Sequence, residues 1–156
     1  MAVVTVHEEI DAPPAQVWAV LADFPNVYRW NPGVESSHAT SDQDTGADAT
    51  RRCDLFGGGF LEERIIDFDP DRRMVVDICE TSLPLARNVV TFTVAPSGTG
   101  SRIGCSANYH LKYGPLGVLI DWLIGRRQAR NGFRDMLRCL KYHVEIGRTV
   151  GRRVPD

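Results

Sequence analysis

The stretch from residue 114 to residue 147 reads Gly114-Pro-Leu-Gly-Val-Leu-Ile-Asp-Trp-Leu-Ile-Gly-Arg-Arg-Gln-Ala-Arg-Asn-Gly-Phe-Arg-Asp-Met-Leu-Arg-Cys-Leu-Lys-Tyr-His-Val-Glu-Ile-Gly147. Its apolar residues recur with a period of about 3.6, which predicts one long helix of about thirty residues to Glu145, closed by Gly147. The apolar face spans about 100° of arc and must cover another layer of the protein. This face consists of Leu119, Leu123, Phe133, Leu137, Leu140 and Val144.

Two arginines interrupt this apolar face. Arg126 and Arg130 fall near its middle, with apolar residues on both sides. Burying a guanidinium group is costly unless it meets a carboxylate, a ligand or water. We therefore expect both side chains to contact a carboxylate or a ligand, with extension to the rim of the site as the alternative.

Residues 34–111 show the pattern of an antiparallel sheet. Apolar residues alternate in short stretches, and turn signals such as Gly57-Gly-Gly59 and Asp69-Pro-Asp71 separate these stretches. Consecutive hairpins of this kind give antiparallel pairing. Together with an N-terminal strand, the pattern predicts seven strands, at residues 2–10, 34–40, 49–56, 60–68, 73–82, 87–95 and 101–112.

Two short helices are expected after the first strand. Asp11-Ala-Pro-Pro14 ends the strand and places prolines at a helix start, where their missing N–H costs nothing. Helical spacing continues to Phe24, Pro25 ends the helix, and a second short turn reaches Trp30. We therefore expect an α+β fold in which the long C-terminal helix covers a seven-stranded sheet.

Composition excludes several classes of protein. A chain of 156 residues with a net charge of -2 predicts one domain and no strong field for nucleic acid. The four cysteines form no Cys-x-x-Cys pair, which argues against a zinc site. The N-terminus lacks the pattern of a secretory signal, and the longest apolar run is shorter than the roughly 20 residues that span a bilayer. We therefore expect a cytoplasmic protein with reduced thiols and without stable membrane insertion.

Several short strings carry a family resemblance. They are Ile10-Asp-Ala-Pro-Pro-Ala-Gln-Val-Trp18, Leu21-Ala-Asp-Phe24, Trp30-Asn-Pro-Gly-Val34, Glu63-Arg-Ile65, Leu83-Pro84 and Gly114-Pro-Leu-Gly117. Their order and spacing resemble the polyketide cyclase/dehydrase and lipid-transport branch of the START-like, helix-grip superfamily. The resemblance implies a strongly curved seven-stranded sheet wrapped around the long helix, with a cavity for an apolar or aromatic molecule. We expect one ligand-binding domain at residues 1–147 and a short basic tail at 148–156.

The resemblance also implies site residues. In relatives that resemble plant abscisic-acid receptors, the glutamate of the Glu-Arg-hydrophobic string lines the cavity, and the loop before that strand gates it. These positions match Glu63 and a gate loop formed by Phe56, Gly57, Gly58 and Gly59. The cavity lysine of those receptors aligns with Glu35. The glycine run lacks the Lys-Ser/Thr of a phosphate loop, and we expect no cofactor and no metal.

Strand alternation supplies two candidate carboxylates. Glu63 shares its parity with Leu61, and Glu80 shares its parity with Val76, which places both on the predicted concave face. Each carboxylate is either a structural ion-pair partner or a ligand contact. Glu63 is in addition a candidate proton-transfer group for aldol or dehydration chemistry.

Alternation leaves open which of Arg51 and Arg52 faces inward, and the inward one is expected to pair with Glu63 across the hairpin.

Aromatic residues either pack in the core or line the cavity beside a planar ligand. The candidate ligand-binding set is therefore Trp30, Glu35, Arg52, Leu61, Glu63, Glu80, Tyr109, Trp122, Arg126 and Arg130.

Three functions are compatible with these features. The leading one is the binding or carriage of a hydrophobic small molecule in an internal cavity of several hundred Å³. The second is a cyclase or dehydratase that acts on an aromatic polyketide-like substrate by general acid–base chemistry. The third is an interaction module without a ligand. Basic residues on the long helix allow transient membrane contact, and the sequence leaves open whether the protein is a monomer or a homodimer.

Overall fold

The computed structural model describes residues 2–112, 114–120 and 124–152. The elements are β1 (Ala2–Ile10), α1 (Pro14–Ala22), the 3-10 helix η1 (Phe24–Arg29), β2 (Val34–Ala39), β3 (Thr50–Leu55), β4 (Phe60–Asp69), β5 (Arg73–Thr81), β6 (Leu85–Ser97), β7 (Gly100–Leu111), α2 (Gly114–Ile120) and α3 (Arg126–Ile146). This order of elements confirms the predicted α+β class.

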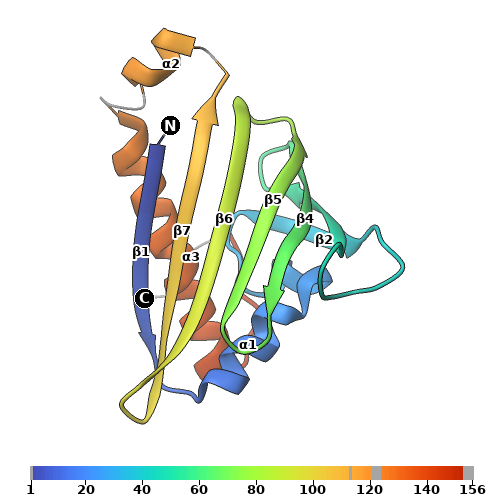
Figure 1. Ribbon diagram of the computed structural model, residues 1–156, viewed down its shortest axis with the longest axis vertical. Helices are drawn as coiled ribbons and strands as arrows, with labels where there is room; N and C mark the ends of the chain where they lie inside the picture. The colour runs from blue at the N-terminus through green and yellow to red at the C-terminus, as the bar shows by residue number, and fades with distance from the viewer. Residues whose placement is uncertain (1, 113, 121–123, 153–156) are drawn as a thin grey trace.

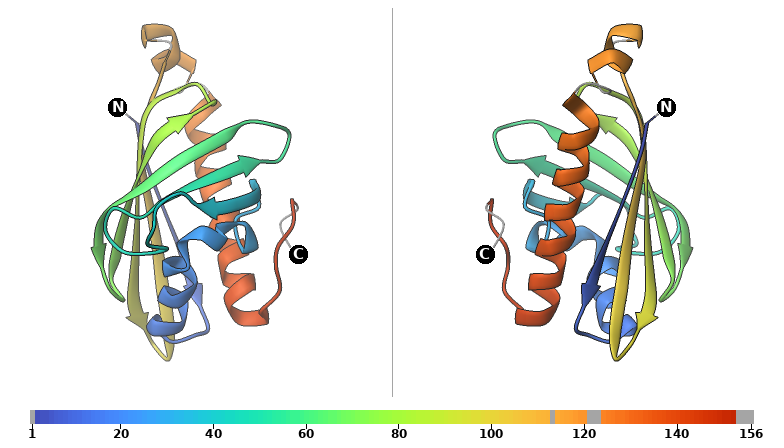
Figure 2. Two further views of the ribbon diagram at one scale, coloured as in Figure 1. Left: turned by 90° about the vertical axis from the view of Figure 1, so that its right-hand side faces the viewer. Right: turned by 90° about the vertical axis from the view of Figure 1, so that its left-hand side faces the viewer.

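The strands form one antiparallel seven-stranded sheet in the order β1-β7-β6-β5-β4-β3-β2. Every strand from β2 to β7 pairs with its neighbour in sequence, and β1 pairs with β7 from Ala2 opposite Tyr109 to Ile10 opposite Ser101. The long strands lie side by side in Figure 1, and Figure 2 shows the sheet curving around α3. The predicted helix-grip architecture is therefore confirmed.

The C-terminal part of α3 covers the concave face of the sheet as its apolar period predicts. Leu137, Leu140 and Val144 are buried. Gly147 adopts a left-handed conformation with φ of 81°, and its N–H donates to the carbonyl of His143. This left-handed residue ends the helix at the predicted position.

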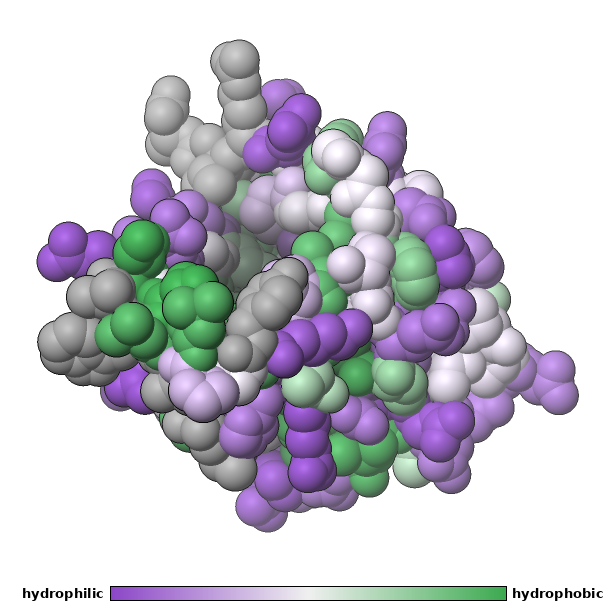
Figure 3. Space-filling model, turned by 90° about the horizontal axis from the view of Figure 1, so that it is seen from above, coloured by the Kyte–Doolittle hydropathy of each residue, from purple (hydrophilic) through white to green (hydrophobic). Residues whose placement is uncertain are grey.

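The prediction of a single long helix is wrong, because α2 and α3 are separate helices. α2 extends past the end of the sheet, where no strand lies beneath it (Figure 1). Leu119, which the helical phase predicts to be buried, is therefore 51% exposed, and Leu116 and Ile120 are exposed as well. Figure 3 shows apolar side chains gathered at this end of the molecule. Leu123, also assigned to the buried face, lies outside the described residues.

The described helices include none that is both long and apolar enough to cross a membrane.

Part of the predicted C-terminal tail packs on the body of the protein. Val150 is buried, and its N–H donates to the carbonyl of Arg29 over 2.8 Å. The tail runs back beside α3 (Figure 2), and Arg152 approaches the turn at Gly57. Its first residues therefore form one side of the candidate site.

Candidate functional site

A cavity of about 160 Å³ lies between α3 and the concave face of the sheet. The end of η1, strands β3 to β6, the β5–β6 loop and α3 all contribute side chains to its wall. The lining residues are Trp30, Asn31, Arg51, Leu61, Glu63, Val76, Ile78, Leu83, Leu85, Asn88, Val90, Phe92, Phe133 and Met136. The wall is mostly apolar, and Arg51 and Glu63 are the charged members of this set.

The cavity is smaller than the several hundred Å³ expected from the sequence. Large side chains from both layers fill much of the space, and Trp30 packs edge-on against Phe92 with the ring centroids 6.2 Å apart. A dry cavity of about 150 Å³ can hold benzene. A cavity of this volume therefore suits a single small ring.

Arg51 and Glu63 form a buried ion pair in the cavity wall. β3 and β4 place the two residues opposite each other, and Arg51 Nε donates to Glu63 Oε2 over 2.5 Å. Arg51 Nη1 also donates to the carbonyl of Phe24 over 2.9 Å, and its guanidinium carbon lies 3.8 Å from the centre of the Phe24 ring. The arginine therefore ties the sheet to η1 and neutralises the glutamate.

A buried thiol completes the surroundings of this carboxylate. Cys53 Sγ lies 3.8 Å from Glu63 Oε2 in donor geometry. Burial, reinforced by the charge of Glu63, raises the pKa of Cys53 to about 12, so its proton stays in place at neutral pH. Both hydrogen bonds to Glu63 fall on Oε2, and within the described part of the chain none reaches Oε1.

Two residues that line the cavity each have a buried polar atom without a hydrogen-bond partner in the described structure. The two atoms are Nε1 of Trp30 and Oδ1 of Asn88. Trp30 is 3% exposed and Asn88 is 8% exposed. A buried polar group without a partner is uncommon and destabilising, which makes this pair a feature that requires an explanation.

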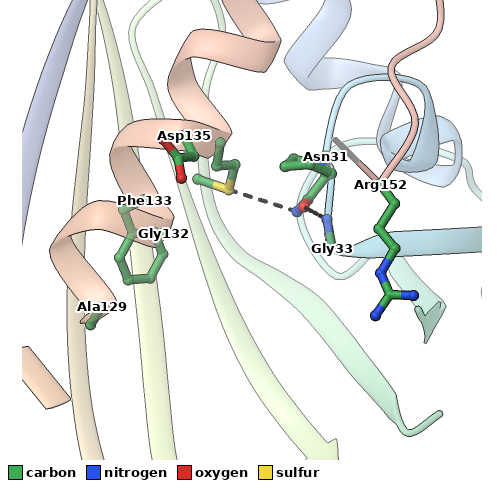
Figure 4. Close-up of a pocket in the computed structure, with 9 residues that line it drawn as sticks. Asn31, Gly33, Ala129, Gly132, Phe133, Asp135 and Arg152 are labelled. Carbon is green, nitrogen blue, oxygen red and sulfur yellow. Dashed lines mark hydrogen bonds between the residues drawn. The ribbon is translucent and has the colours of Figure 1, made fainter. Parts of the chain in front are cut away.

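An open groove of about 440 Å³ adjoins the cavity (Figure 4). It runs between α3 and the loop after η1, and Arg152 of the tail forms part of its rim. Asn31, Phe133 and Met136 line both the groove and the cavity. Asn31 Nδ2 lies 3.7 Å from Met136 Sδ, and this contact crosses from the loop to the helix. These three side chains therefore lie where the groove and the cavity meet.

Three predicted site residues come together in the cavity. Trp30, Leu61 and Glu63 all line it, as their positions in the sequence suggest. The structure also resolves the open choice between the two arginines, because Arg51 faces inward. That any of these residues contacts a ligand stays a prediction.

The inward placement of Arg52 and Glu35 is wrong. The pairing of Arg51 with Glu63 puts Arg52 on the outer face, where it forms ion pairs with Asp54 and Glu62. Glu35 is exposed because its neighbour Val34 takes the buried position on β2. Simple alternation therefore places Glu35 in solvent and Arg52 on the partly exposed outer face.

Glu80 is exposed, and its predicted inward orientation is also wrong. A register shift in the β4–β5 pairing sets Glu63 opposite Ile78 and Glu62 opposite Glu80. Glu80 consequently shares the outer face with Glu62. It lines a second pocket of about 190 Å³ at the β5–β6 end of the sheet, which shares Ile78, Leu85 and Asn88 with the cavity. The bulge therefore puts Glu63 and Glu80 on different faces of the sheet, although strand alternation in the sequence predicts the same face for both.

Arg126 and Arg130 are exposed, which corrects their predicted burial. Both lie in the first turns of α3, before the part of the helix that covers the core. Their position on the apolar side of the helix therefore does not bury them.

Tyr109 is buried on β7 opposite Asn88, but it is absent from the lining of the described cavity. Trp122 lies outside the described residues.

The predicted gate loop forms the turn between β3 and β4. Gly57, Gly58 and Gly59 all have positive φ, which lets the chain reverse tightly, and Phe56 is half-buried. None of these four residues lines the described cavity or groove. Their gating role stays a prediction.

Sequence reasoning missed Asn88, which lines the cavity from β6. A signal was available, because Asn88 shares its parity with Val90, Phe92 and Val94 and is the polar member of that inward row. Asn31 and Met136 offered no comparable signal, since their place depends on how α3 meets the η1 loop. The described residues contain no group of three side chains suited to hold a metal ion.

The curved seven-stranded sheet and the long helix that it surrounds define a helix-grip fold. Residues 1–145 match the family described as polyketide cyclase / dehydrase and lipid transport, and the chain belongs to this family. The resemblance carried by the short sequence strings is thereby confirmed. No curated protein sequence matches the chain.

Solved structures share the fold at low sequence identity. A protein of Thermus thermophilus is 22% identical with a TM-score of 0.75, over 94% of this chain and 99% of its own. XoxI of Bacillus cereus is 22% identical with a TM-score of 0.73, over 93% and 96%. DynU16, from the dynemicin biosynthetic locus, is 18% identical with a TM-score of 0.72, over 94% of this chain and 48% of its own. These likenesses establish the fold alone.

Proposed function

We propose that this protein binds a compact, mostly apolar molecule with one ring inside the cavity and acts as a carrier or binding protein. The observation that supports this most directly is the composition of the wall. Its charged side chains, Arg51 and Glu63, neutralise each other, and most of the remaining lining is aliphatic or aromatic. Such a wall favours an uncharged apolar ligand, which gains by leaving water.

The groove provides the route by which this ligand reaches the cavity. Phe133 and Met136 on α3 and Asn31 on the facing loop belong to both spaces. Rotation of these side chains opens the route without movement of the sheet. The Asn31 to Met136 contact involves sulfur, a weak acceptor, and is therefore easily broken.

Native mass spectrometry of freshly purified protein tests this function, because a bound cellular molecule reports its own mass. A second test adds p-xylene, a purely apolar one-ring probe, and follows thermal unfolding. Binding to the folded state alone raises the unfolding temperature with probe concentration. Val90→Phe fills the cavity and should abolish this rise, whereas Ile66→Phe, at an exposed position on β4, should retain it. No rise with the unmodified protein would refute the proposal.

A second candidate function is general acid–base catalysis of the cyclase or dehydratase kind. The observation that favours it is Glu63 itself, a cavity-lining carboxylate whose described hydrogen bonds engage Oε2. The family description and the origin of DynU16 in a biosynthetic locus agree with such chemistry. In this scheme Glu63 takes a proton from the carbon between two carbonyl groups, and the electron pair passes to a carbonyl oxygen as the enolate forms.

Proton exchange of 2,4-pentanedione in D₂O measures this step with a small 1,3-diketone. Glu63→Gln should lower the protein-catalysed rate by about 10²- to 10⁴-fold, the usual contribution of a general base, and should leave diketone affinity nearly unchanged. Glu62→Gln on the outer face is the matched control. An exchange rate that is equal with and without protein would reject catalysis and leave the carrier function in place.

A further inference from the structure

We propose that the end of the molecule formed by α2 docks on the surface of an anionic lipid bilayer. This α2 surface has an apolar part, which consists of Leu116, Leu119, Ile120 and Ile124. Its basic part consists of Lys112, Arg127 and Arg130. None of these residues lines the described cavity or groove, so docking does not depend on what the cavity binds.

The apolar side chains of the α2 surface are exposed and close together in the chain. Each of the four is at least 43% exposed, and they make up half of the large apolar residues that are exposed in the described structure. Leu116 lies three and four residues before Leu119 and Ile120, the spacings that bring side chains onto one face of a helix. Single exposed apolar residues are normal, whereas a group of this kind marks a contact with a protein or a membrane.

α2 projects from the body of the protein. It lies beyond the end of the sheet in Figure 1, and Figure 3 shows apolar side chains gathered there with hydrophilic side chains beside them. A bilayer is flat on the scale of this protein, so a projecting helix reaches it while the sheet stays in water. A helix that lies in the membrane interface buries its apolar face by about 5–10 Å and does not cross the bilayer.

Basic side chains flank the apolar part on both sides in the chain. Lys112 comes just before α2, and Arg127 and Arg130 lie in the first turns of α3. Arg127 follows Ile124 by three residues within helical structure, which makes the two side chains neighbours. All three basic residues are exposed, and no ion pair within residues 2–112, 114–120 and 124–152 engages any of them.

The charge of this region favours an anionic membrane over a second copy of the chain. The whole chain has a net charge of -2, yet residues 112–134 contain five basic residues and one acidic residue. A two-fold dimer interface brings the same patch of each copy together, so these basic residues would repel each other. Anionic lipids instead attract basic residues that lie within a Debye length of the bilayer surface.

The α2 surface adjoins one end of the cavity. The N–H of Lys112 donates to the carbonyl of Pro84 over 3.1 Å, so the chain that leads into α2 lies beside the β5–β6 loop. Leu83 of this loop is exposed and also lines the cavity. Docking through α2 therefore turns this end of the cavity toward the bilayer.

Cosedimentation with lipid vesicles tests the proposal. One set of vesicles contains phosphatidylcholine alone, and the other contains in addition about 30% phosphatidylserine, which makes its surface anionic. The unmodified protein should bind the anionic vesicles at least about tenfold more tightly, and about 0.5 M salt should remove most of this difference by screening.

Paired variants assign the contact to the α2 surface. Leu116→Ser with Leu119→Ser should weaken binding to the anionic vesicles about tenfold or more, because two apolar side chains no longer leave water. Ile66→Ser with Ile146→Ser changes two exposed apolar residues elsewhere and should bind as the unmodified protein does.

Arg127→Gln with Arg130→Gln should likewise weaken binding to the anionic vesicles about tenfold or more, with little effect on binding to phosphatidylcholine. The matched control, Arg64→Gln with Arg148→Gln, removes two exposed charges outside the α2 surface and should leave binding unchanged. All these positions are exposed, so the variants should unfold at nearly the temperature of the unmodified protein.

Three results would overturn the proposal. They are a lack of binding to anionic vesicles at low salt, equal losses in the α2-surface variants and their controls, and a dimer in sedimentation that Leu116→Ser with Leu119→Ser converts to a monomer. The last result would identify α2 as an interface between two copies of the chain. The binding of p-xylene to the same variants reports on the cavity separately, so failure of docking leaves the carrier function in place.

Discussion

Arg51 and Glu63 face each other across β3 and β4, and their side chains are joined in the cavity wall by a hydrogen bond from Nε to Oε2. The same guanidinium holds the carbonyl of Phe24 and lies over its ring, so one side chain connects the sheet, η1 and the candidate site. The candidate site therefore depends on an ion pair that is buried away from water.

Arg51→Met should therefore destabilise the protein by roughly 3 kcal/mol, because it leaves Glu63 buried without its partner. Urea-induced unfolding at neutral pH measures this change. Arg52→Met is the control, because Arg52 forms its ion pairs on the partly exposed outer face, where such pairs contribute about 1 kcal/mol or less. Equal losses in the two variants would contradict the structural role assigned to Arg51.

Gly132 lines the groove from α3, and a Cβ atom there would meet no other atom within 4 Å. Gly132→Ala should stabilise the protein by about 0.5–1 kcal/mol, because glycine weakens a helix interior. If the groove is the route to the cavity, Gly132→Phe should slow both the association and the dissociation of p-xylene relative to Gly132→Ala and leave its affinity nearly unchanged, because the ligand crosses the same barrier in both directions. Stopped-flow binding separates these rates, and an unchanged association rate would show that ligands use another route.

Cys79 is exposed, whereas Cys53, Cys105 and Cys139 are buried. Burial raises the pKa of Cys105 to about 12 and that of Cys139 to about 11, so these thiols remain protonated at pH 8. Reaction of the native protein with a coloured disulfide reagent should therefore show one rapid step. Cys79→Ser should remove that step, and a rapid step that survives the substitution would contradict the burial of the other three.

Glu145 joins the end of α3 to the junction after β1. Burial by itself would raise the pKa of Glu145, but hydrogen bonds from Lys141 and from the N–H of Asp11 outweigh it and lower the pKa below its usual value. Because the pKa is lower in the folded state, the carboxylate stabilises the fold above its unfolded pKa, and this contribution is lost as the pH falls through the folded pKa.

Glu145→Gln should consequently cost about 0.5 kcal/mol at pH 7, the scale of a partly exposed ion pair, and the cost should disappear in acid. Urea unfolding at pH 7 and near pH 3 measures the difference. Glu35→Gln, at an exposed position on β2, is the control variant and should change the stability little. A constant cost of Glu145→Gln at both pH values would indicate that its charge plays no part.

Periodicity predicted the strands and the C-terminal part of the long helix, and the family resemblance implied how the sheet curves around that helix. The alternation of β1, in which Val4, Val6 and Ile10 are buried, and the helical phase of Leu137 and Leu140 both match the structure. These features depend on the geometry of a single strand or helix, which neighbouring residues determine. The predicted strands consequently lie close to the observed ones, and Gly147 ends α3 as expected.

The composition of the site required the tertiary structure. Sequence parity alone could not choose between Arg51 and Arg52, and it placed Glu80 beside Glu63 because it could not reveal the register shift in the β4–β5 pairing. The exposure of Arg130 depends on how far the core extends along α3. Register, bulges and the extent of the neighbouring layer are set by contacts between segments distant in sequence, and these contacts alone brought Trp30 and Asn88 to one cavity.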